Sequence, residues 1–260
     1  MTSTLVSATA PLAPLVADWD SDALLDDVLP RLPRDPERDV PGNAHHEYRQ
    51  ETIENYESEY DSRFFEAYLR SRDDLSHDFL AFLDAWSEDE VRHSRGFARI
   101  YAALFDKDFE ALWSALPERA ADSDFSGVDH LFEDEFHILV LFAFDELCTT
   151  RAYCQERDQY FEQYGGGLLW DWISNVARDE AYHMANCIRL LRRHHAHRLH
   201  EVPAVFEKLK ALAHQDLPYM GTFVLDQSLY LDDPEYVTGI MDEVTRRLLG
   251  KDAPSVVAAA

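Results

Sequence analysis

The chain has 260 residues, of which 46% are hydrophobic and 12% aromatic, which is enough for one globular domain with a full core. Its 24 Lys and Arg stand against 50 Asp and Glu, and the formal net charge of −26 argues against a nucleic-acid partner, which needs a basic surface. The only cysteines, Cys148, Cys154 and Cys187, indicate no disulfide framework.

Neither an export signal nor a membrane span is expected. The opening stretch, MTSTLVSATAPLAPLVADWD, lacks the basic flank and the continuous apolar run of a signal peptide. No later run approaches the roughly 20 apolar residues that cross a bilayer. We therefore expect a cytoplasmic protein with no membrane partner.

Residues 1–42 are rich in Pro and Asp, and we expect them to form a loose or partly docked segment. Breaks at SRDD, ADSDFSG and YGGG then separate four predicted long helices, at residues 43–71, 74–106, 126–164 and 167–200. Residues 201–250 are predicted to form shorter helices packed on these four, and residues 251–260 a frayed tail. The predicted fold is all-α, with an antiparallel four-helix bundle at residues 43–200 and additional C-terminal helices.

Two of the predicted helices carry a Glu and a His within their apolar face. Glu90 and His93 interrupt the face of the second helix, and Glu180 and His183 interrupt the face of the fourth in the same phase. With 21 Glu and 12 His, about one Glu-x-x-His is expected by chance, so the phase matters more than the motif. Burying unpaired carboxylates and imidazoles is costly, and a bound metal removes that cost.

The other two helices each supply one acid. Glu146 lies on the apolar face of the third helix, and Glu57 fits the apolar face of the first best, with Glu54 and Glu59 as alternatives. Glu57 precedes Glu90 by 33 residues and Glu146 precedes Glu180 by 34, which indicates a duplicated helix hairpin.

This pattern predicts a di-metal site. One Glu from each of two helices and Glu-x-x-His from each of the other two is the ligand layout of di-metal carboxylate bundles. Four carboxylates neutralise two divalent cations, and ligation by oxygen and imidazole without thiolate favours iron or manganese over structural zinc. The predicted ligands are Glu57, Glu90, His93, Glu146, Glu180 and His183.

Three further residues are candidates for roles around the metals. Asp89 and Asp179 each precede a ligand Glu, and we expect them to accept the free imidazole N–H; the alternative is a solvated acid. Thr149 follows Glu146 by one turn, where its hydroxyl is a candidate to contact dioxygen or relay protons. The alternative for Thr149 is a hydrogen bond to a backbone carbonyl.

Several stretches resemble those of the soluble acyl-acyl carrier protein desaturases of the ferritin-like superfamily. They are WSEDEVRH, FDELCT, RDEAYH and FEKLKALAHQDLPYMG, and the resemblance covers about residues 45 to 250. It implies that the six predicted ligands bind iron, with Thr149 near the dioxygen site and Asp179 behind the ligands. It also implies a homodimer that oxidises an unactivated C–H bond with dioxygen and with electrons from a donor such as a ferredoxin.

Two positions bear on how far the resemblance extends. The family has an N-terminal Trp that contacts the residues behind the ligands, and Trp19 is the candidate here. N-oxygenating relatives carry an additional His where this chain has Val176, which argues against arylamine oxygenation.

The substrate and the functional class have alternatives. An acidic acyl carrier would be repelled by the net charge, unless the Arg and His of RLLRRHHAHRLH dock it; the other interpretation of that stretch is a charge run that complements a helix C-terminus. Without carrier docking, the substrate would be a free small acid, an amino acid or a natural-product intermediate that is hydroxylated or otherwise oxidised. A third possible function is iron storage by ferroxidase activity. The additional residues after the fourth helix argue mildly against it.

Overall fold

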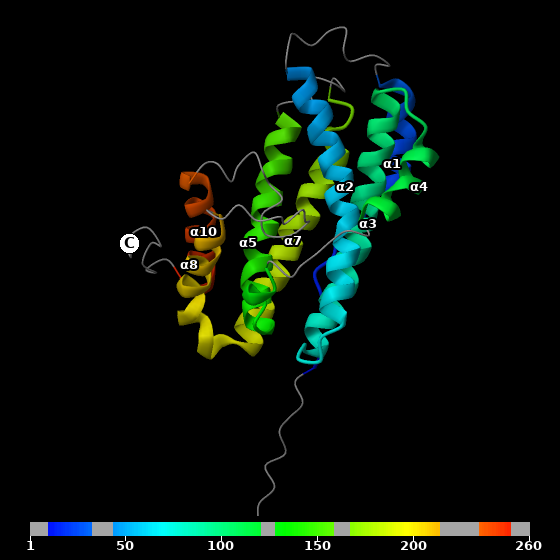
Figure 1. Ribbon diagram of the computed structural model, residues 1–260. Coiled ribbons are helices and arrows are strands. Elements are labelled where there is room, and N and C mark those ends of the chain that lie inside the picture. Colours follow the sequence, from blue (N-terminus) through cyan, green and yellow to red (C-terminus); the bar gives the residue numbers. More distant parts are fainter. Residues whose placement is uncertain (1–9, 33–43, 121–127, 159–166, 214–233, 251–260) are drawn as a thin grey trace, which may run out of the picture.

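A computed structural model of the chain describes residues 10–32, 44–120, 128–158, 167–213 and 234–250 (Figure 1). These ranges contain eight α-helices and no β-strand, which confirms the predicted all-α class. None of the described helices combines the length and the apolar character needed to cross a bilayer. The predicted break ADSDFSG, most of YGGG and the predicted tail at 251–260 lie outside the described residues.

Four long helices lie side by side along the molecule (Figure 1): α2 (Ala44–Arg70), α3 (His77–Leu104), α5 (Glu135–Glu156) and α7 (Trp170–His194). Helix α2 packs against α3, α5 packs against α7, and α3 also contacts α7, which joins the two pairs. The shorter helices α1 (Ser21–Val28) and α4 (Phe109–Ala120) lie against the first pair. Helices α8 (Val202–Ala213) and α10 (Pro234–Leu249) lie against α5.

Three helices differ from the predicted ranges. Helix α5 begins at Glu135 rather than near 126, because the Asp134 side chain accepts a hydrogen bond from the backbone N–H of His137 and caps the helix there. Helix α7 was predicted to extend to residue 200, but it ends at His194. A 3-10 helix at Ala196–Glu201 follows it. Helix α4 was not predicted, since Pro117 within it has a low helical propensity.

A layer of acids and histidines divides the core into two apolar regions. One region, around Phe79, Phe142 and Leu191, lies on one side of the layer, and the other, around Phe97 and Trp172, lies on the opposite side. The predicted apolar faces of α3 and α7 account for this arrangement, because the interruptions at Glu90, His93, Glu180 and His183 are all buried. The sequence order apolar, polar, apolar therefore places the polar layer midway along each of these helices.

The phase of α2 differs from the prediction. The predicted face of Glu57 is shared with Ile53, Tyr60 and Phe64. Tyr60 is buried, but Ile53 and Phe64 are only half-buried, whereas the polar residues Thr52, Glu59 and Ser62 are buried. Because these polar residues are buried beside apolar ones such as Tyr56 and Phe65, hydrophobic periodicity does not identify which acid of α2 is buried.

Helices α3 and α7 approach closely at Gly96. A Cβ at this position would lie 2.1 Å from the Trp172 indole, so we expect Gly96→Ala to lower the free energy of unfolding by about 1–3 kcal/mol or more through overpacking. Gly239 in α10 is the matched control, because a Cβ there meets no atom within 4 Å. Gly239→Ala should raise stability by about 0.5–1 kcal/mol by helix propensity. Urea unfolding of both variants tests this, and equal midpoints would contradict the close packing.

Candidate metal centre

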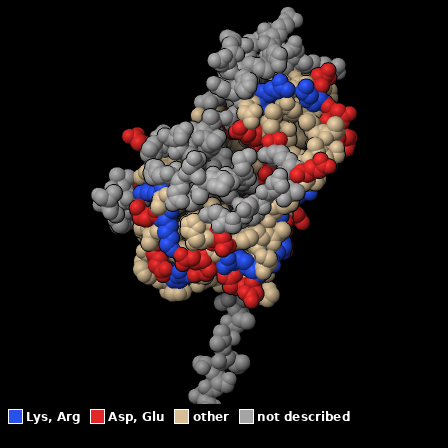
Figure 2. Space-filling view, viewed as in Figure 1, with Lys and Arg blue, Asp and Glu red and all other residues tan. Residues whose placement is uncertain are grey.

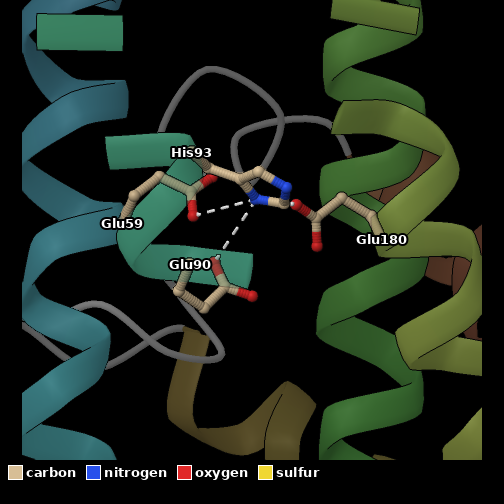
Figure 3. A group of neighbouring side chains, drawn as sticks. All are labelled: Glu59, Glu90, His93 and Glu180. Atoms are coloured by element: carbon tan, nitrogen blue, oxygen red, sulfur yellow. Dashed lines mark ion pairs between the residues drawn. The ribbon is translucent and has the colours of Figure 1, made fainter. Parts of the chain in front are cut away.

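The buried layer holds two overlapping groups of side chains with ligand atoms close enough to share a metal ion. In the first group the atoms come from Glu59, Glu90, His93 and Glu180 (Figure 3), and in the second from Glu90, Glu146, Glu180 and His183. Within each group all these atoms lie within 4.8 Å of one another. Glu90 and Glu180 belong to both groups, so each metal position would have one imidazole and would share two carboxylates with the other.

The structure places Glu59, not Glu57, in this cluster. Glu59 is 5% exposed and faces His93 from α2, with 3.7 Å between its Oε2 and the His93 Nδ1, whereas Glu57 is half-buried and belongs to neither group. The prediction of Glu57 rests on a face that it shares with Ile53, Tyr60 and Phe64, and of these three residues only Tyr60 is buried. The other five predicted ligands lie in the cluster.

Several polar atoms in the first group have no hydrogen-bond partner in the described part of the chain. They are Oε2 of Glu59, Oε1 of Glu180 and Nδ1 of His93, all buried. The last two lie only 3.0 Å apart without forming a properly directed hydrogen bond. Leaving such atoms unsatisfied is costly, and a divalent cation between them would satisfy all three, so the residues present fit a metal ion.

Each imidazole is oriented by an Asp from the opposite helix. The Nε2 of His93 lies 3.1 Å from Oδ2 of Asp179 on α7, and the Nε2 of His183 lies 3.0 Å from Oδ2 of Asp89 on α3. Arg92 bridges the two acids, at 2.6 Å from Asp89 and 2.8 Å from Asp179. Because Nε2 donates to a carboxylate, Nδ1 of each ring faces the glutamates, as a metal-binding imidazole requires. Both acids thus contact the imidazoles as expected, although across helices.

Trp19 reaches the same network from the N-terminal segment. Its Nε1 donates to Oδ2 of Asp179 at 2.7 Å, and the Arg92 guanidinium lies over its ring at 4.9 Å. The segment is therefore docked here, and Trp19 occupies the position for which the sequence made it a candidate. Val176 is fully buried in the apolar region around Phe97 and adds no imidazole.

The carboxylates of the cluster differ in their pKa values. Burial, together with the charge of Glu59, raises the pKa of Glu90 well above its usual value, and burial likewise raises the pKa of Glu146. For Glu180, burial acts in the same direction but is outweighed by the two imidazoles, which lower its pKa. Without a cation, the cluster therefore tends to hold protons on Glu90 and Glu146 and to ionise Glu180.

The imidazoles have raised pKa values. Burial opposes protonation of His93 and His183, but the carboxylates around each ring outweigh burial and raise both pKa values well above the usual range. Asp179 shows the reciprocal effect: burial is outweighed by His93, so its pKa is lowered. Metal ligation must displace the protons that the rings carry.

Tyr153 contacts the cluster and was not identified as a site residue from the sequence. It is 2% exposed, and its hydroxyl donates a hydrogen bond to Oε1 of Glu59, which leaves Oε2 directed at His93. The signal was present, because Tyr153 follows Glu146 by two helical turns on the same face. No sequence pattern identified Arg92, which bridges the two acids, as a site residue.

Tyr153→Phe is expected to weaken metal binding at the Glu59 group by roughly 10-fold, because loss of an outer hydrogen bond frees a ligand carboxylate to rotate. Tyr101→Phe is the matched control: this buried tyrosine hydroxyl contacts Arg49, away from the cluster. Titration with Mn(II) followed by electron paramagnetic resonance measures both affinities. Equal affinities for the two variants would show that the Tyr153 hydroxyl does not position Glu59.

Thr149 makes the backbone hydrogen bond that is the structural alternative for this residue, and it also borders a cavity. Its hydroxyl donates to the backbone carbonyl of Asp145 at 3.2 Å, and the cavity is small and lies beside the cluster.

Four Arg and His residues at and after the end of α7 are paired with the protein's own acids. Arg198 pairs with Asp134 and Glu201, and His195 lies 3.1 Å from Glu135. Arg193 and His194 both contact Asp78. Over the face drawn in Figure 2, Lys and Arg side chains of the described residues likewise lie beside Asp and Glu. Arg193, His194, His195 and Arg198 of the basic stretch are thus paired within the chain.

Comparison with known proteins adds no relative: no protein-family model, no curated protein and no solved structure matches the chain.

Proposed function

We propose that this chain is a di-iron, dioxygen-dependent oxidoreductase built on a ferritin-like four-helix bundle. The observation that carries the proposal is the pair of buried ligand groups that share Glu90 and Glu180 and contain one imidazole each. Four carboxylates match the charge of two divalent cations, and this donor set suits iron or manganese better than structural zinc. The docked Trp19 and the crossed Asp–His pairs support the likeness to the acyl-acyl carrier protein desaturases.

The reaction proposed is oxidation of an unactivated C–H bond, by desaturation or by hydroxylation. Iron bound at this cluster would supply the one-electron and dioxygen chemistry that no side chain here provides. Complete reduction of dioxygen takes more electrons than one C–H oxidation yields, so an external donor such as a ferredoxin is part of the proposal. We further propose a cytoplasmic homodimer.

The chain's own residues have defined tasks in this proposal. Asp89 and Asp179 hold each imidazole by its Nε2–H, and Arg92 offsets the charge of both acids. Trp19, half-buried and hydrogen-bonded to Asp179, gives the external donor a contact that leads to His93. The two apolar regions on either side exclude bulk water from the ligands.

Reconstitution tests the proposal. The protein is loaded anaerobically with ferrous iron, its iron content is measured, and oxygen consumption is followed with acyl-carrier and free small-molecule candidates. We expect about two irons per chain and a product that has lost two hydrogens or gained one oxygen atom, by mass spectrometry.

Other results would redirect or reject the proposal. Mineralisation of many irons per chain in a large assembly would indicate a ferroxidase instead. Failure to retain iron, in a chain that is fully helical, would overturn the di-iron assignment.

A further inference from the structure

A small cavity lies against the carboxylates of the cluster, between α2 and α5. Its lining includes neither histidine of the cluster but all four of its glutamates, which are Glu59, Glu90, Glu146 and Glu180. The cavity therefore meets the metal positions on their carboxylate side, away from the imidazoles and from the acids that orient them. Its volume is about 30 Å³, which holds about two water molecules.

Trp86 of α3 borders this cavity and carries a hydrogen-bond donor that has no acceptor in the described part of the chain. The residue is 4% exposed, and its Nε1 is buried. Its ring packs edge-on against Phe142 and Phe65, with ring centres 5.1 and 6.4 Å away, and neither neighbour offers an acceptor. An indole N–H can only donate, and leaving such a buried donor unsatisfied costs about 1–3 kcal/mol. An acceptor placed in the cavity would remove that cost.

A metal ion cannot serve as that acceptor. Among the described residues, Oε2 of Glu59 and Oε1 of Glu180 also have no partner, and a cation would satisfy both; an N–H group instead needs a lone pair. The hydroxyls of Ser62 and Thr149 line the cavity too, but they donate to backbone carbonyls of their own helices at 2.6 and 3.2 Å. Metal binding alone would therefore leave the Trp86 N–H unsatisfied, and a second ligand would satisfy it.

Resting on the metal centre of the function proposed above, we propose that this cavity binds a compact hydrogen-bond acceptor and that Trp86 Nε1 is its donor. The ligand class is a molecule of about two or three non-hydrogen atoms with an oxygen or nitrogen lone pair, such as formate or azide. Each metal position receives four side chains from the protein, whereas manganese favours octahedral coordination and oxygenase iron sites keep open positions. One atom of the ligand would contact a metal while another accepts from Trp86.

Charge makes binding of an anionic ligand depend on the metals. In the metal-free protein, an anion would enter beside the carboxylates of the cluster, which repel it. Two divalent cations offset the charge of the four glutamates and attract the anion directly. We therefore expect azide to bind the loaded protein and not the metal-free one.

Azide titration of Zn(II)-loaded protein labelled with ¹⁵N-tryptophan tests the inference by NMR. Zinc is diamagnetic, and each of the five tryptophans gives its own Nε1–H signal. We expect azide to shift the Trp86 signal downfield and to leave the Trp172 signal in place, because the Trp172 N–H already donates to Ser21 at 2.8 Å. Failure of azide to bind, or bound azide with an unchanged Trp86 signal, would overturn the inference.

Substitution of Trp86 measures the contribution of the donor. Trp86→Phe keeps an aromatic ring against Phe142 and removes the N–H, so the azide affinity of Mn(II)-loaded protein should fall by roughly 10-fold or more with the metal content unchanged. Trp172→Phe is the matched control, since Trp172 is equally buried and its N–H is held by Ser21. Equal azide affinities in the two variants would reject the role of Trp86. If Trp86→Phe does not fold, the NMR titration of the wild-type protein decides the question.

This inference and the proposed function fail in different ways. An iron-loaded protein in which azide contacts Trp86, but which consumes no oxygen with any candidate substrate, would overturn the proposed function and leave this inference standing. A protein that holds two metals and consumes oxygen, but in which azide never reaches Trp86, would overturn this inference alone.

Discussion

Glu180→Ala is expected to abolish tight binding of both metal ions and to leave the chain helical. Glu180 contributes a ligand atom to both groups, and both imidazoles lie about it, with Nδ1 of His93 at 3.0 Å and Nδ1 of His183 at 3.1 Å. Its removal takes one charge and one shared ligand from each metal position at once. His93→Ala removes a ligand from one group only, so we expect the loss of one ion from that variant.

A matched pair of substitutions on α2 compares Glu59, which lies in the cluster, with Glu57, which the sequence predicts as a ligand. Glu59→Gln should lower the metal content or affinity at the first group by at least 10- to 100-fold, whereas Glu57→Gln should leave it unchanged. Inductively coupled plasma mass spectrometry on reconstituted protein measures the metal content, and far-ultraviolet circular dichroism confirms that each variant is folded. Loss of metal from the Glu57 variant alone would reverse the assignment.

Removal of the metal should lower the melting temperature by about 10–20 °C. A metal that binds only the folded chain at 100 times its dissociation constant stabilises it by about 2.7 kcal/mol, and two such sites by about 5 kcal/mol. For a chain of this size each kcal/mol shifts the midpoint by about 2–4 °C. Scanning calorimetry before and after treatment with a chelator, with Glu180→Ala as the control that should not respond, measures the effect. An unchanged midpoint for the wild-type protein would contradict metal binding in the core.

The same sites should lose affinity as the pH falls. Burial raises the pKa of Glu90 and of Glu146, and the surrounding carboxylates raise the pKa of His93 and of His183, so these groups keep protons to higher pH than usual. Metal binds only their deprotonated forms; uptake therefore releases protons, and the affinity rises with pH. Mn(II) titrations at about pH 6 and about pH 8, with an indicator dye to count released protons, give the sign directly. Affinity that is higher at the lower pH would show that the carboxylates and imidazoles do not ligate the ion.

How much the sequence reveals differs from helix to helix. On α3 and α7 the acids and histidines interrupt otherwise apolar faces, so the helical period identifies the buried face from the sequence. Glu90, His93, Glu180 and His183 lie in the cluster as predicted. On α2 the buried positions mix apolar residues, such as Tyr56 and Phe65, with polar ones, such as Thr52, Glu59 and Ser62, so the apolar pattern does not single out the buried acid. Periodicity depends on contrast between the two faces of a helix, and α2 has little.

Contacts between segments that are far apart in the chain cannot be predicted from local sequence patterns. The sequence by itself determined the all-α class, the helical hairpins with their paired Glu-x-x-His and five of the six side chains that meet in the core, because helical period fixes which residues share a face. Only the tertiary structure decided that Glu59 completes the set, that Tyr153 holds it, and that each Asp orients the His of the opposite helix. These contacts depend on the rotation of each helix against its neighbours, which is set by packing across the whole core rather than by residues nearby in the chain.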